Sequence, residues 1–450
     1  MLSIYNQILN ILNKHPETEK IKRDKLAIYH VMGIAHQNLG FSENSHVVFH
    51  EGKRLSEELD DKESLHSFSF LLDFYYSCTG NPSLVIERAK NSFKKGLESN
   101  DIQLTIGSAE NLWVAYLAPD EDQKSIEVLI KAINFLDQAN IDIKTNPLIP
   151  VFYADFCGRY AEILSCTGDL EKSEVYCKKA HHYTTLNNAE PPHNELAGAT
   201  TENNFGLLYL LKGYGKLALE RFQKSLTLLE EINYLRMIPN TLVRMGNAYA
   251  IVGDFDRALE SIERGLKLRN MEHPFIQYVD NISLAEIQYE TSDYNKAALY
   301  AEKALEISKK SNIKWAEGKT NILLGCISRQ QEKSQIKKAE AFILYGITKL
   351  EEVNYKWMIA KGYSELGELY RSAGRKEDTI NALKKAELIF VELRTVYYLA
   401  RIHEIYHLVY KDEGDFPKSR KHLIQAIDIM KEFGADGWVE RYEKELAELT

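Results

Sequence analysis

GNAYAIVGDFDRALESIERGL, at residues 246–266, is the stretch of the chain that decides the fold. A small residue, Gly246, is followed three positions later by Tyr249, and a Gly-Asp-Phe triplet comes next. Ala258 and Ile262 stand twelve and sixteen positions after Gly246. Residues three or four apart share one face of an α-helix. This spacing therefore predicts two helices, with the small residue of the first helix packed against the apolar residues of the second. The Gly-Asp-Phe triplet predicts the turn between them.

The same spacing recurs along the chain. GLLYLLKGYGKLALERFQKSL, at 206–226, repeats it with Gly206, Tyr209, Ala218 and Phe222. Weaker copies extend the pattern in both directions, and the first small-residue positions, or their equivalents, follow one another every 39 to 48 residues. These positions are Gly33, Asp73, Trp113, Ala161, Gly206, Gly246, Ala285, Gly325, Gly367 and His407. A period near 40 predicts ten helix–turn–helix hairpins, each of which buries its apolar face by stacking on its neighbours.

Two other features agree with this period. The phrases EEINY and EEVNY begin at residues 230 and 351, and 351 − 230 = 121 residues is about three periods of 40. Proline is scarce, at 10 of 450 residues, and none of the prolines has to stand inside a helix. A chain of this composition sustains many helices and few tight hairpins.

The repeat resembles the tetratricopeptide repeat (TPR) family, through Gly206, Tyr209, Ala218 and Phe222 and their equivalents in 246–266. The unit here is about 40 residues, whereas the family unit is 34, and longer units are similar to the arrays of bacterial signalling and regulatory proteins. The resemblance implies an all-α fold, a right-handed α-solenoid (superhelix) of about ten hairpins with terminal capping helices. We expect a single solenoid over 1–450. Its parts are an N-terminal capping helix at 1–23, a first sub-array at 24–186, a second sub-array at 187–434 and a C-terminal capping helix at 435–450.

Composition excludes several classes of function. The formal net charge is 56 − 65 = −9, which argues against a nucleic-acid binder, because such proteins need cationic surface to neutralise phosphates. The five cysteines are widely spaced, which predicts buried reduced thiols. The chain contains no run of 18 apolar residues, so we expect no membrane span and a cytoplasmic protein.

Two strings imitate chemical motifs. HEIYH at 403–407 satisfies the H-E-x-x-H spacing of zinc proteases, but His407 occupies a packing position of the repeat. Gly318-Lys319-Thr320 resembles the end of a phosphate-binding loop, yet Ile313 stands where that loop needs its first glycine. We therefore expect no enzyme, no cofactor and no metal.

The first helices of TPR hairpins line the concave face, and the resemblance places a binding groove there. The candidate groove residues are Asn203, Asn204, Asn240, Asn247, Glu286, Tyr289, Lys319, Arg329, Lys361, Arg371 and Arg401. Side-chain amides donate to and accept from an extended peptide backbone, and the cations suit an acidic portion of a ligand. Residues 303–338 add a local excess of nine Lys/Arg over three Glu.

These features predict a protein–protein interaction scaffold or adaptor that binds a peptide segment or a partner protein in the groove. The alternative is a regulatory sensor arm that controls a signalling effector, either attached to this chain or separate from it. The partner is a protein or peptide, with acidic character as one expectation, and the oligomeric state is left open. For each groove candidate taken alone, the competing interpretation is an ordinary solvated residue on a helix surface.

Overall fold

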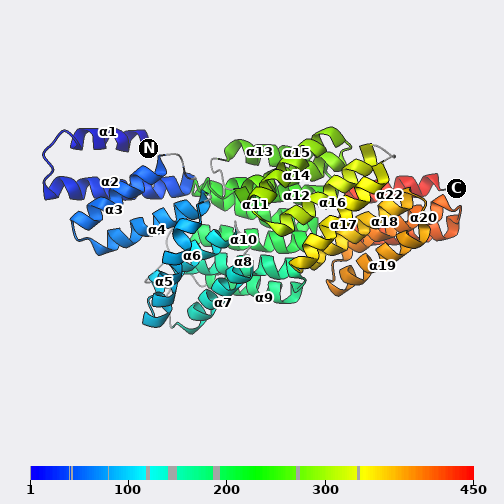
Figure 1. Ribbon diagram of the computed structural model, residues 1–450, viewed down its shortest axis with the longest axis horizontal. Coiled ribbons are helices and arrows are strands. Elements are labelled where there is room, and N and C mark those ends of the chain that lie inside the picture. Colours follow the sequence, from blue (N-terminus) through cyan, green and yellow to red (C-terminus); the bar gives the residue numbers. More distant parts are fainter. Residues whose placement is uncertain are drawn as a thin grey trace. The chain divides into compact units, whose positions relative to one another are not determined.

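The computed structural model describes residues 2–39, 41, 44–79, 81–117, 122–139, 149–185, 193–269, 274–331 and 335–449. Over these residues the chain forms 22 α-helices and no β-strand (Figure 1). Ten successive pairs form hairpins between a leading and a trailing helix, so the predicted all-helical array is confirmed. The predicted sub-array boundary at 186/187 lies outside the described part of the chain. So do two turn glycines, Gly40 and Gly80, one of the ten prolines, Pro147, and the side chain of one of the five cysteines, Cys166.

The helices of the first part are α1(Leu2–Leu12), α2(Glu19–Leu39), α3(Ser45–Glu58), α4(Lys62–Cys78), α5(Ser83–Ser99), α6(Ile102–Leu117) and α7(Asp122–Gln138). The middle hairpins are α8(Ile149–Thr167) with α9(Leu170–Thr185), α10(His193–Lys212) with α11(Gly215–Glu231), α12(Ile238–Val252) with α13(Phe255–Leu268), and α14(Pro274–Glu290) with α15(Tyr294–Lys310). The last helices are α16(Lys314–Gln331), α17(Ile336–Glu352), α18(Lys356–Ser372), α19(Lys376–Glu392), α20(Val396–Asp412), α21(Phe416–Glu432) and α22(Asp436–Glu448).

Several of the turns that the structure describes inside hairpins have the chemistry that the sequence predicts. Gly253 ends α12 with a φ of +86°, a left-handed conformation that a residue without Cβ adopts at little cost. The side chain of the next residue, Asp254, accepts a hydrogen bond from the backbone N of Arg257 at 3.1 Å and so caps α13. Asp169, Asp293 and Asp415 accept equivalent bonds at the starts of α9, α15 and α21.

The connections between hairpins use asparagine. Asn233 and Asn354, the fourth residues of EEINY and EEVNY, have φ values of +52° and +56°. Asn100 and Asn312 adopt the same left-handed conformation at the ends of α5 and α15. Asparagine tolerates this region better than other residues with a Cβ, so the repeated phrases mark the end of a second helix.

Where the repeat position is glycine, it permits close helix packing. A Cβ built on Gly246 would lie 2.5 Å from Cγ1 of Ile262, and one on Gly206 would lie 2.6 Å from the ring of Phe222. Both pairs are sixteen residues apart, as the repeat predicts. Gly325 instead meets Ile343, eighteen residues later, because the chain has two extra residues before α17.

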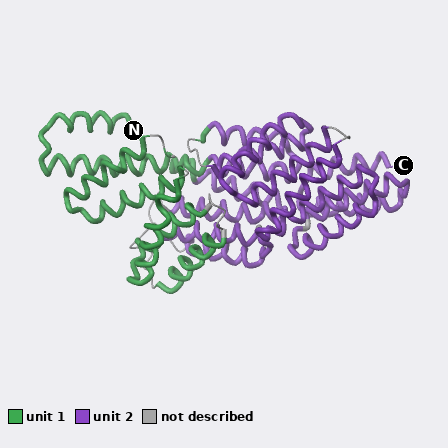
Figure 2. The backbone as a smooth tube through the Cα atoms, in the orientation of Figure 1, with its two compact units in different colours: residues 1–142, 229–238, 268–273 green, residues 143–228, 239–267, 274–450 purple. Residues whose placement is uncertain are grey.

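The described chain divides into two compact units (Figure 2). Unit 1 comprises residues 1–142, 229–238 and 268–273, and unit 2 comprises residues 143–228, 239–267 and 274–450. The position of the sub-array boundary proposed from the sequence stays a prediction.

Unit 1 has a phenylalanine-rich core. Phe49, Phe68 and Phe74 are fully or almost fully buried, and a Cβ on Gly52 would fall 2.3 Å from the ring of Phe68. The 229–238 segment docks on these helices through Arg236, whose guanidinium lies 4.4 Å from the centroid of the Phe74 ring. The backbone N of Arg236 also donates to the carbonyl of Asn38 at 2.9 Å.

Unit 2 carries contacts between hairpins that are far apart in sequence. The rings of Tyr214 and Phe433 stack with centroids 4.4 Å apart, and the indole N–H of Trp438 donates to the carbonyl of Ala250 at 3.3 Å. Gly253 and Gly437 approach so closely that a Cβ on Gly437 would lie 2.7 Å from the Gly253 carbonyl oxygen. We call these residues, 213–216 and 250–255 with 433–438, the turn contact.

Candidate functional site

All eleven groove candidates lie in unit 2 on the leading helices of the hairpins. Asn203 and Asn204 are on α10, Asn240 and Asn247 on α12, and Glu286 and Tyr289 on α14. Lys319 and Arg329 are on α16, Lys361 and Arg371 on α18, and Arg401 on α20. Their shared location on one class of helix agrees with the predicted register, whereas their role in binding stays a prediction.

Glu286 is the centre of the first charged cluster. Its carboxylate accepts hydrogen bonds from Lys319 at 2.9 Å and from Lys361 at 3.0 Å. These lysines belong to the next hairpin and to the one after it, so one carboxylate joins three successive repeats. Burial raises the pKa of Glu286, but the two ammonium groups outweigh this effect and hold it at about 2. Glu286 is therefore ionised at neutral pH.

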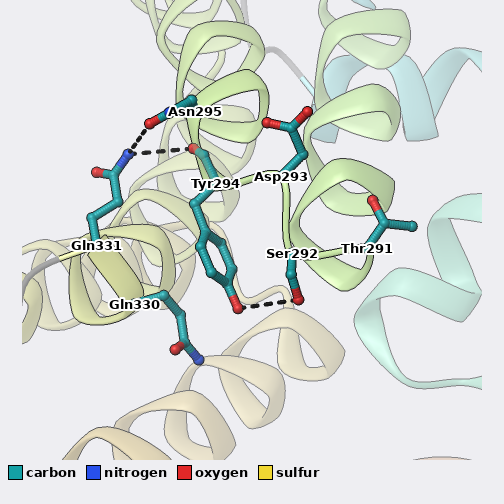
Figure 3. A pocket seen from close by; sticks show the side chains of 7 residues that line it. All are labelled: Thr291, Ser292, Asp293, Tyr294, Asn295, Gln330 and Gln331. Atoms are coloured by element: carbon teal, nitrogen blue, oxygen red, sulfur yellow. Dashed lines mark hydrogen bonds between the residues drawn. The ribbon is translucent and has the colours of Figure 1, made fainter.

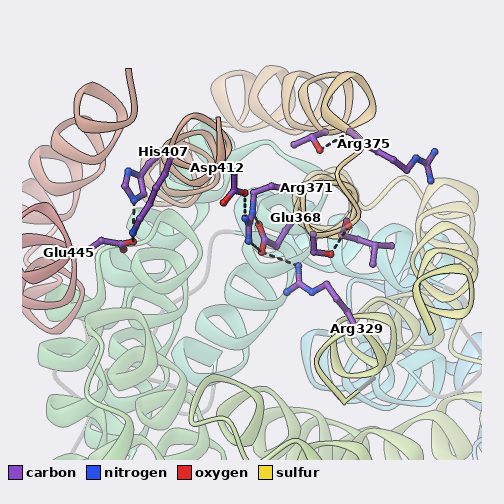
Figure 4. A network of polar contacts seen from close by, with 11 residues as sticks. Arg329, Glu368, Arg371, Arg375, His407, Asp412 and Glu445 are labelled. Atoms are coloured by element: carbon purple, nitrogen blue, oxygen red, sulfur yellow. Dashed lines mark hydrogen bonds and ion pairs between the residues drawn. The ribbon is translucent and has the colours of Figure 1, made fainter. Parts of the chain in front are cut away.

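Arg329 and Arg371 share a second carboxylate (Figure 4). Arg371 donates through Nε and Nη2 to both oxygens of Glu368, each at 2.8 Å, and Nη1 of Arg329 lies 3.4 Å from the same carboxylate. Arg329 also donates to the hydroxyl of Tyr289 at 2.9 Å, and Arg371 reaches Asp412 on α20. Bidentate pairs of this kind fix side-chain orientation as well as charge.

A third cluster surrounds Arg401. Its guanidinium pairs with Glu404 at 2.9 Å and lies 4.2 Å from the centroid of the Trp438 ring on α22. The hydroxyl of Tyr442 donates to Glu404 at 2.8 Å, and burial together with this carboxylate raises the pKa of Tyr442. The last leading helix is thus tied to the final helix through buried polar groups.

The asparagines are held by neighbouring helices. Asn203 donates to the hydroxyl of Thr241 at 2.7 Å and accepts from Arg244, both on α12. Asn247 donates to Ser283 on α14 at 3.4 Å, and Asn204 donates to the carbonyl of Ala154 on α8 at 3.0 Å. Asn240 is half-buried near the start of α12 and makes polar contacts of its own.

The cations of this region and Glu368 fall at groove positions predicted from the repeat register, but their pairing with carboxylates was not predicted. Glu368, Glu404 and Asp412 neutralise cations that we expected to face an acidic ligand. Glu290 and Glu365 were also missed; burial raises the pKa of Glu290, and Glu365 accepts from the thiol of Cys326 at 3.2 Å. A spacing signal was present, because Glu365 and Glu368 follow Lys361 by four and seven positions, which places them on one helix face.

A polar depression lies next to this region (Figure 3). It has a volume of about 780 Å³ and is lined by Thr291, Ser292, Asp293, Tyr294, Asn295, Gln330 and Gln331. The residues come from the α14–α15 turn and the last turn of α16, directly after Tyr289 and Arg329 in sequence. Gln331 donates to the carbonyl of Tyr294 and to the Asn295 side chain, so the rim is prearranged by hydrogen bonds.

The strings that imitated chemical motifs do not form the corresponding sites. His407 is fully buried, and its Nδ1 contacts the Ser419 hydroxyl at 2.8 Å while its Nε2 faces Glu445 at 3.1 Å. His403 points instead toward His422 on α21. Lys319 of the phosphate-loop-like string pairs with Glu286 in the middle of α16.

The described helices form successive helix–turn–helix hairpins, and their repeat chemistry is similar to that of TPR proteins. Residues 239–270 match the family model described as "Tetratricopeptide repeat". This segment contains the stretch from which the sequence argument started, so the predicted likeness to TPR proteins is confirmed.

Three known proteins are similar to the chain. Response regulator aspartate phosphatase I of Bacillus subtilis (strain 168) is 26% identical over 176 residues, which are 38% of this chain and 45% of that relative. The match thus spans less than half the length of the relative. A Rap protein complexed with competence and sporulation factor superposes with a TM-score of 0.53 at 12% identity, covering 77% of this chain and 99% of the other.

NprR in complex with its cognate peptide NprX superposes with a TM-score of 0.50 at 15% identity, covering 76% of this chain and 97% of the other. At these identities the two superpositions establish a shared helical-repeat fold. None of the described helices of this chain is long and apolar enough to cross a membrane.

Proposed function

We propose that this chain is a regulatory interaction scaffold whose leading helices α10 to α20 bind a peptide segment of a partner. The observation that carries the proposal is the continuous series of polar side chains along these helices, ordered by hydrogen bonds from one repeat to the next. Such an ordered surface presents amide and charged groups to an extended backbone without a large entropic cost. The similar NprR structure holds its cognate peptide NprX and the similar Rap structure holds competence and sporulation factor, and both complexes support this proposal.

The ion pairs within the site determine how strongly it attracts an acidic ligand. Lys319, Lys361, Arg329, Arg371 and Arg401 each have a carboxylate partner within the protein. Their net attraction for an acidic peptide is therefore weaker than the sequence alone suggests. An acidic ligand remains part of the prediction, and the cytoplasm is the compartment that we propose for the interaction.

The test is a binding assay of the full chain against a library of short synthetic peptides, followed by affinity measurements on the peptide that binds best. We expect Asn247→Ala and the charge-matched double variant Glu286→Gln/Lys361→Met to weaken binding at least tenfold. Lys310→Ala, an exposed change at the end of α15, is the matched control and should bind as the parent does. Equal affinities in all four proteins would remove the assignment of the site.

The regulatory alternative rests on a different observation, the turn contact of unit 2. A ligand that binds between repeats changes the angle between them. Such a change either keeps the two sides of the turn contact together or separates them, which gives unit 2 a closed and an open state. In this version the chain controls a signalling effector. Hydrogen exchange at 250–255 and 433–438 with and without the bound peptide tests it, and unchanged exchange would exclude it.

Because the Bacillus relative is a response regulator aspartate phosphatase, a phosphatase is the enzymatic alternative. We propose binding without catalysis for this chain. Incubation with a phosphorylated response-regulator domain should release phosphate at the rate of the domain alone, and a faster release that depends on the chain would overturn this part of the proposal.

A further inference from the structure

His403 on α20 and His422 on α21 face each other across one hairpin. Their Nδ1 atoms are 3.1 Å apart, and the ring centroids are separated by 5.3 Å. The pair lies outside the groove set described above, and the peptide-binding proposal does not use it. Two imidazole nitrogens at this distance are bridged either by a proton, in a hydrogen bond, or by a cation that both nitrogens bind.

Aromatic packing fixes this geometry. The ring of Tyr410 stacks on His422 with a centroid distance of 5.4 Å and an interplanar angle of 9°, and Tyr406 lies 5.1 Å from the same ring. The hydroxyl of Tyr406 in turn donates to Glu387 on α19 at 3.3 Å. Orientation by neighbours of this kind is a property of preorganised ligand pairs.

The distance suits a divalent transition metal. Such ions bind imidazole nitrogen at about 2.0–2.1 Å, so two nitrogens 3.1 Å apart subtend about 98° at the metal. That angle lies between the 90° of square-planar or octahedral geometry and the 109° of tetrahedral geometry, about 10° from either. The separation of the two nitrogens is therefore compatible with both coordination types.

We infer that His403 and His422 form a two-imidazole site for a divalent first-row transition metal, with water in the remaining positions. Burial lowers the pKa of both rings, so each offers a lone pair at pH 7.5. Among the described residues no group of three His, Cys, Asp or Glu side chains is placed to hold a metal, so this is an open site of two protein ligands. Imidazole ligation and the usual order of affinities favour Cu²⁺ over Ni²⁺ and Zn²⁺.

The surrounding charges modulate this site. Glu387 is the carboxylate that acts on His403, and it favours a cation. Burial, together with His403, Lys421 and the buried His407, lowers the pKa of His422. His407 is not a ligand, because Ser419 and Glu445 occupy its two nitrogens, so the H-E-x-x-H string contributes one histidine only.

Titration of the untagged full chain with Cu²⁺ and Zn²⁺ by calorimetry, with Cu²⁺ electron paramagnetic resonance as a second readout, tests the inference. We expect one equivalent of Cu²⁺ to bind with imidazole nitrogen couplings in the spectrum. His403→Asn and His422→Asn should each weaken binding at least tenfold, whereas His182→Asn, an exposed control on α9, should have no effect. Two variants on different helices keep the test valid if one of them misfolds. Parent-like affinity in both folded variants would show that the pair shares only a proton and would overturn the site.

Discussion

At the scale of single residues, packing excludes a larger side chain at several of the repeat glycines, Gly246 among them. Gly246 stands inside α12, where alanine normally stabilises a helix by about 1 kcal/mol. The position nevertheless rejects a methyl group, because the Cβ would lie 2.5 Å from Ile262 and 2.8 Å from the carbonyl oxygen of Ala258. The backbone oxygen cannot move aside without shifting α13. Packing therefore overrides propensity at this site.

Gly246→Ala is accordingly expected to lower the free energy of unfolding by about 1–3 kcal/mol, the usual range for overpacking. Gly198→Ala is the matched control on α10, because its Cβ would meet only Leu228 at an ordinary 3.4 Å. Urea unfolding followed by circular dichroism measures both. A stabilised Gly246→Ala variant would mean that propensity, and not packing, governs the position.

Glu286 provides a residue-scale prediction for pH. Its pKa is about 2 in the folded state against 4.5 ordinarily, so the unfolded chain binds more protons between these values. Stability from Glu286 is therefore fully present above pH 4.5 and is lost as the pH falls toward 2. We expect Glu286→Gln to cost about 1–3 kcal/mol at pH 7 and progressively less below pH 4.5.

Urea unfolding at pH 7, 5 and 3 checks this dependence. Glu302→Gln, an exposed change on α15, serves as the control and should show a small difference at every pH. A Glu286→Gln deficit that stays constant across the three pH values would contradict the assigned pairing with Lys319 and Lys361.

At the scale of elements, α22 completes the array by packing on two different hairpins. Trp438 and Tyr442 are buried, and Leu446 packs against the same cluster of α20 and α21 residues. Trp438 also meets Phe255 edge to face, with ring centroids 5.8 Å apart. The sequence predicted a C-terminal capping helix at 435–450, but a contact with α13 could not be predicted from a local pattern.

Trp438→Ala is expected to destabilise unit 2 by about 3–5 kcal/mol, because it removes a buried indole and leaves a cavity between α20 and α13. Glu440→Ala, on an exposed position of the same helix, should change stability by less than about 0.5 kcal/mol. Thermal and urea unfolding of both variants measure these changes in the free energy of unfolding. A loss similar to that of Glu440→Ala would show that α22 is not part of the cooperative unit.

At the scale of the whole molecule, the parts that could be predicted are those encoded by short spacings. The 40-residue period, the Gly-Asp turns and the pairing of Gly206 with Phe222 all depend on residues within one hairpin. Helical geometry fixes such relations locally.

The parts that escaped prediction depend on separation along the chain. Lys361 meets Glu286 across two repeats, 75 residues apart in sequence. Nine helices, α13 to α21, separate Gly253 from Gly437 in sequence, and the angles between them must add up to bring the two glycines together. Curvature accumulates from small rotations at each repeat interface, and no single residue encodes it.

The turn contact supplies the prediction at this scale. Gly437→Leu places a side chain where even a Cβ would lie 2.7 Å from the Gly253 carbonyl oxygen, so the two turns must separate. Each hairpin keeps its own core, because the contact involves turns and not the small-residue interfaces. We expect faster hydrogen exchange at 250–255 and 433–438, with exchange in α14–α17 unchanged.

Gly414→Asn is the control, since Gly414 has a φ of +75° that asparagine tolerates and no neighbour within 4 Å of its Cβ. Exchange that accelerates throughout unit 2 in Gly437→Leu would show instead that the turn contact holds the repeats together, and unit 2 would then be a closed structure with no independent open state.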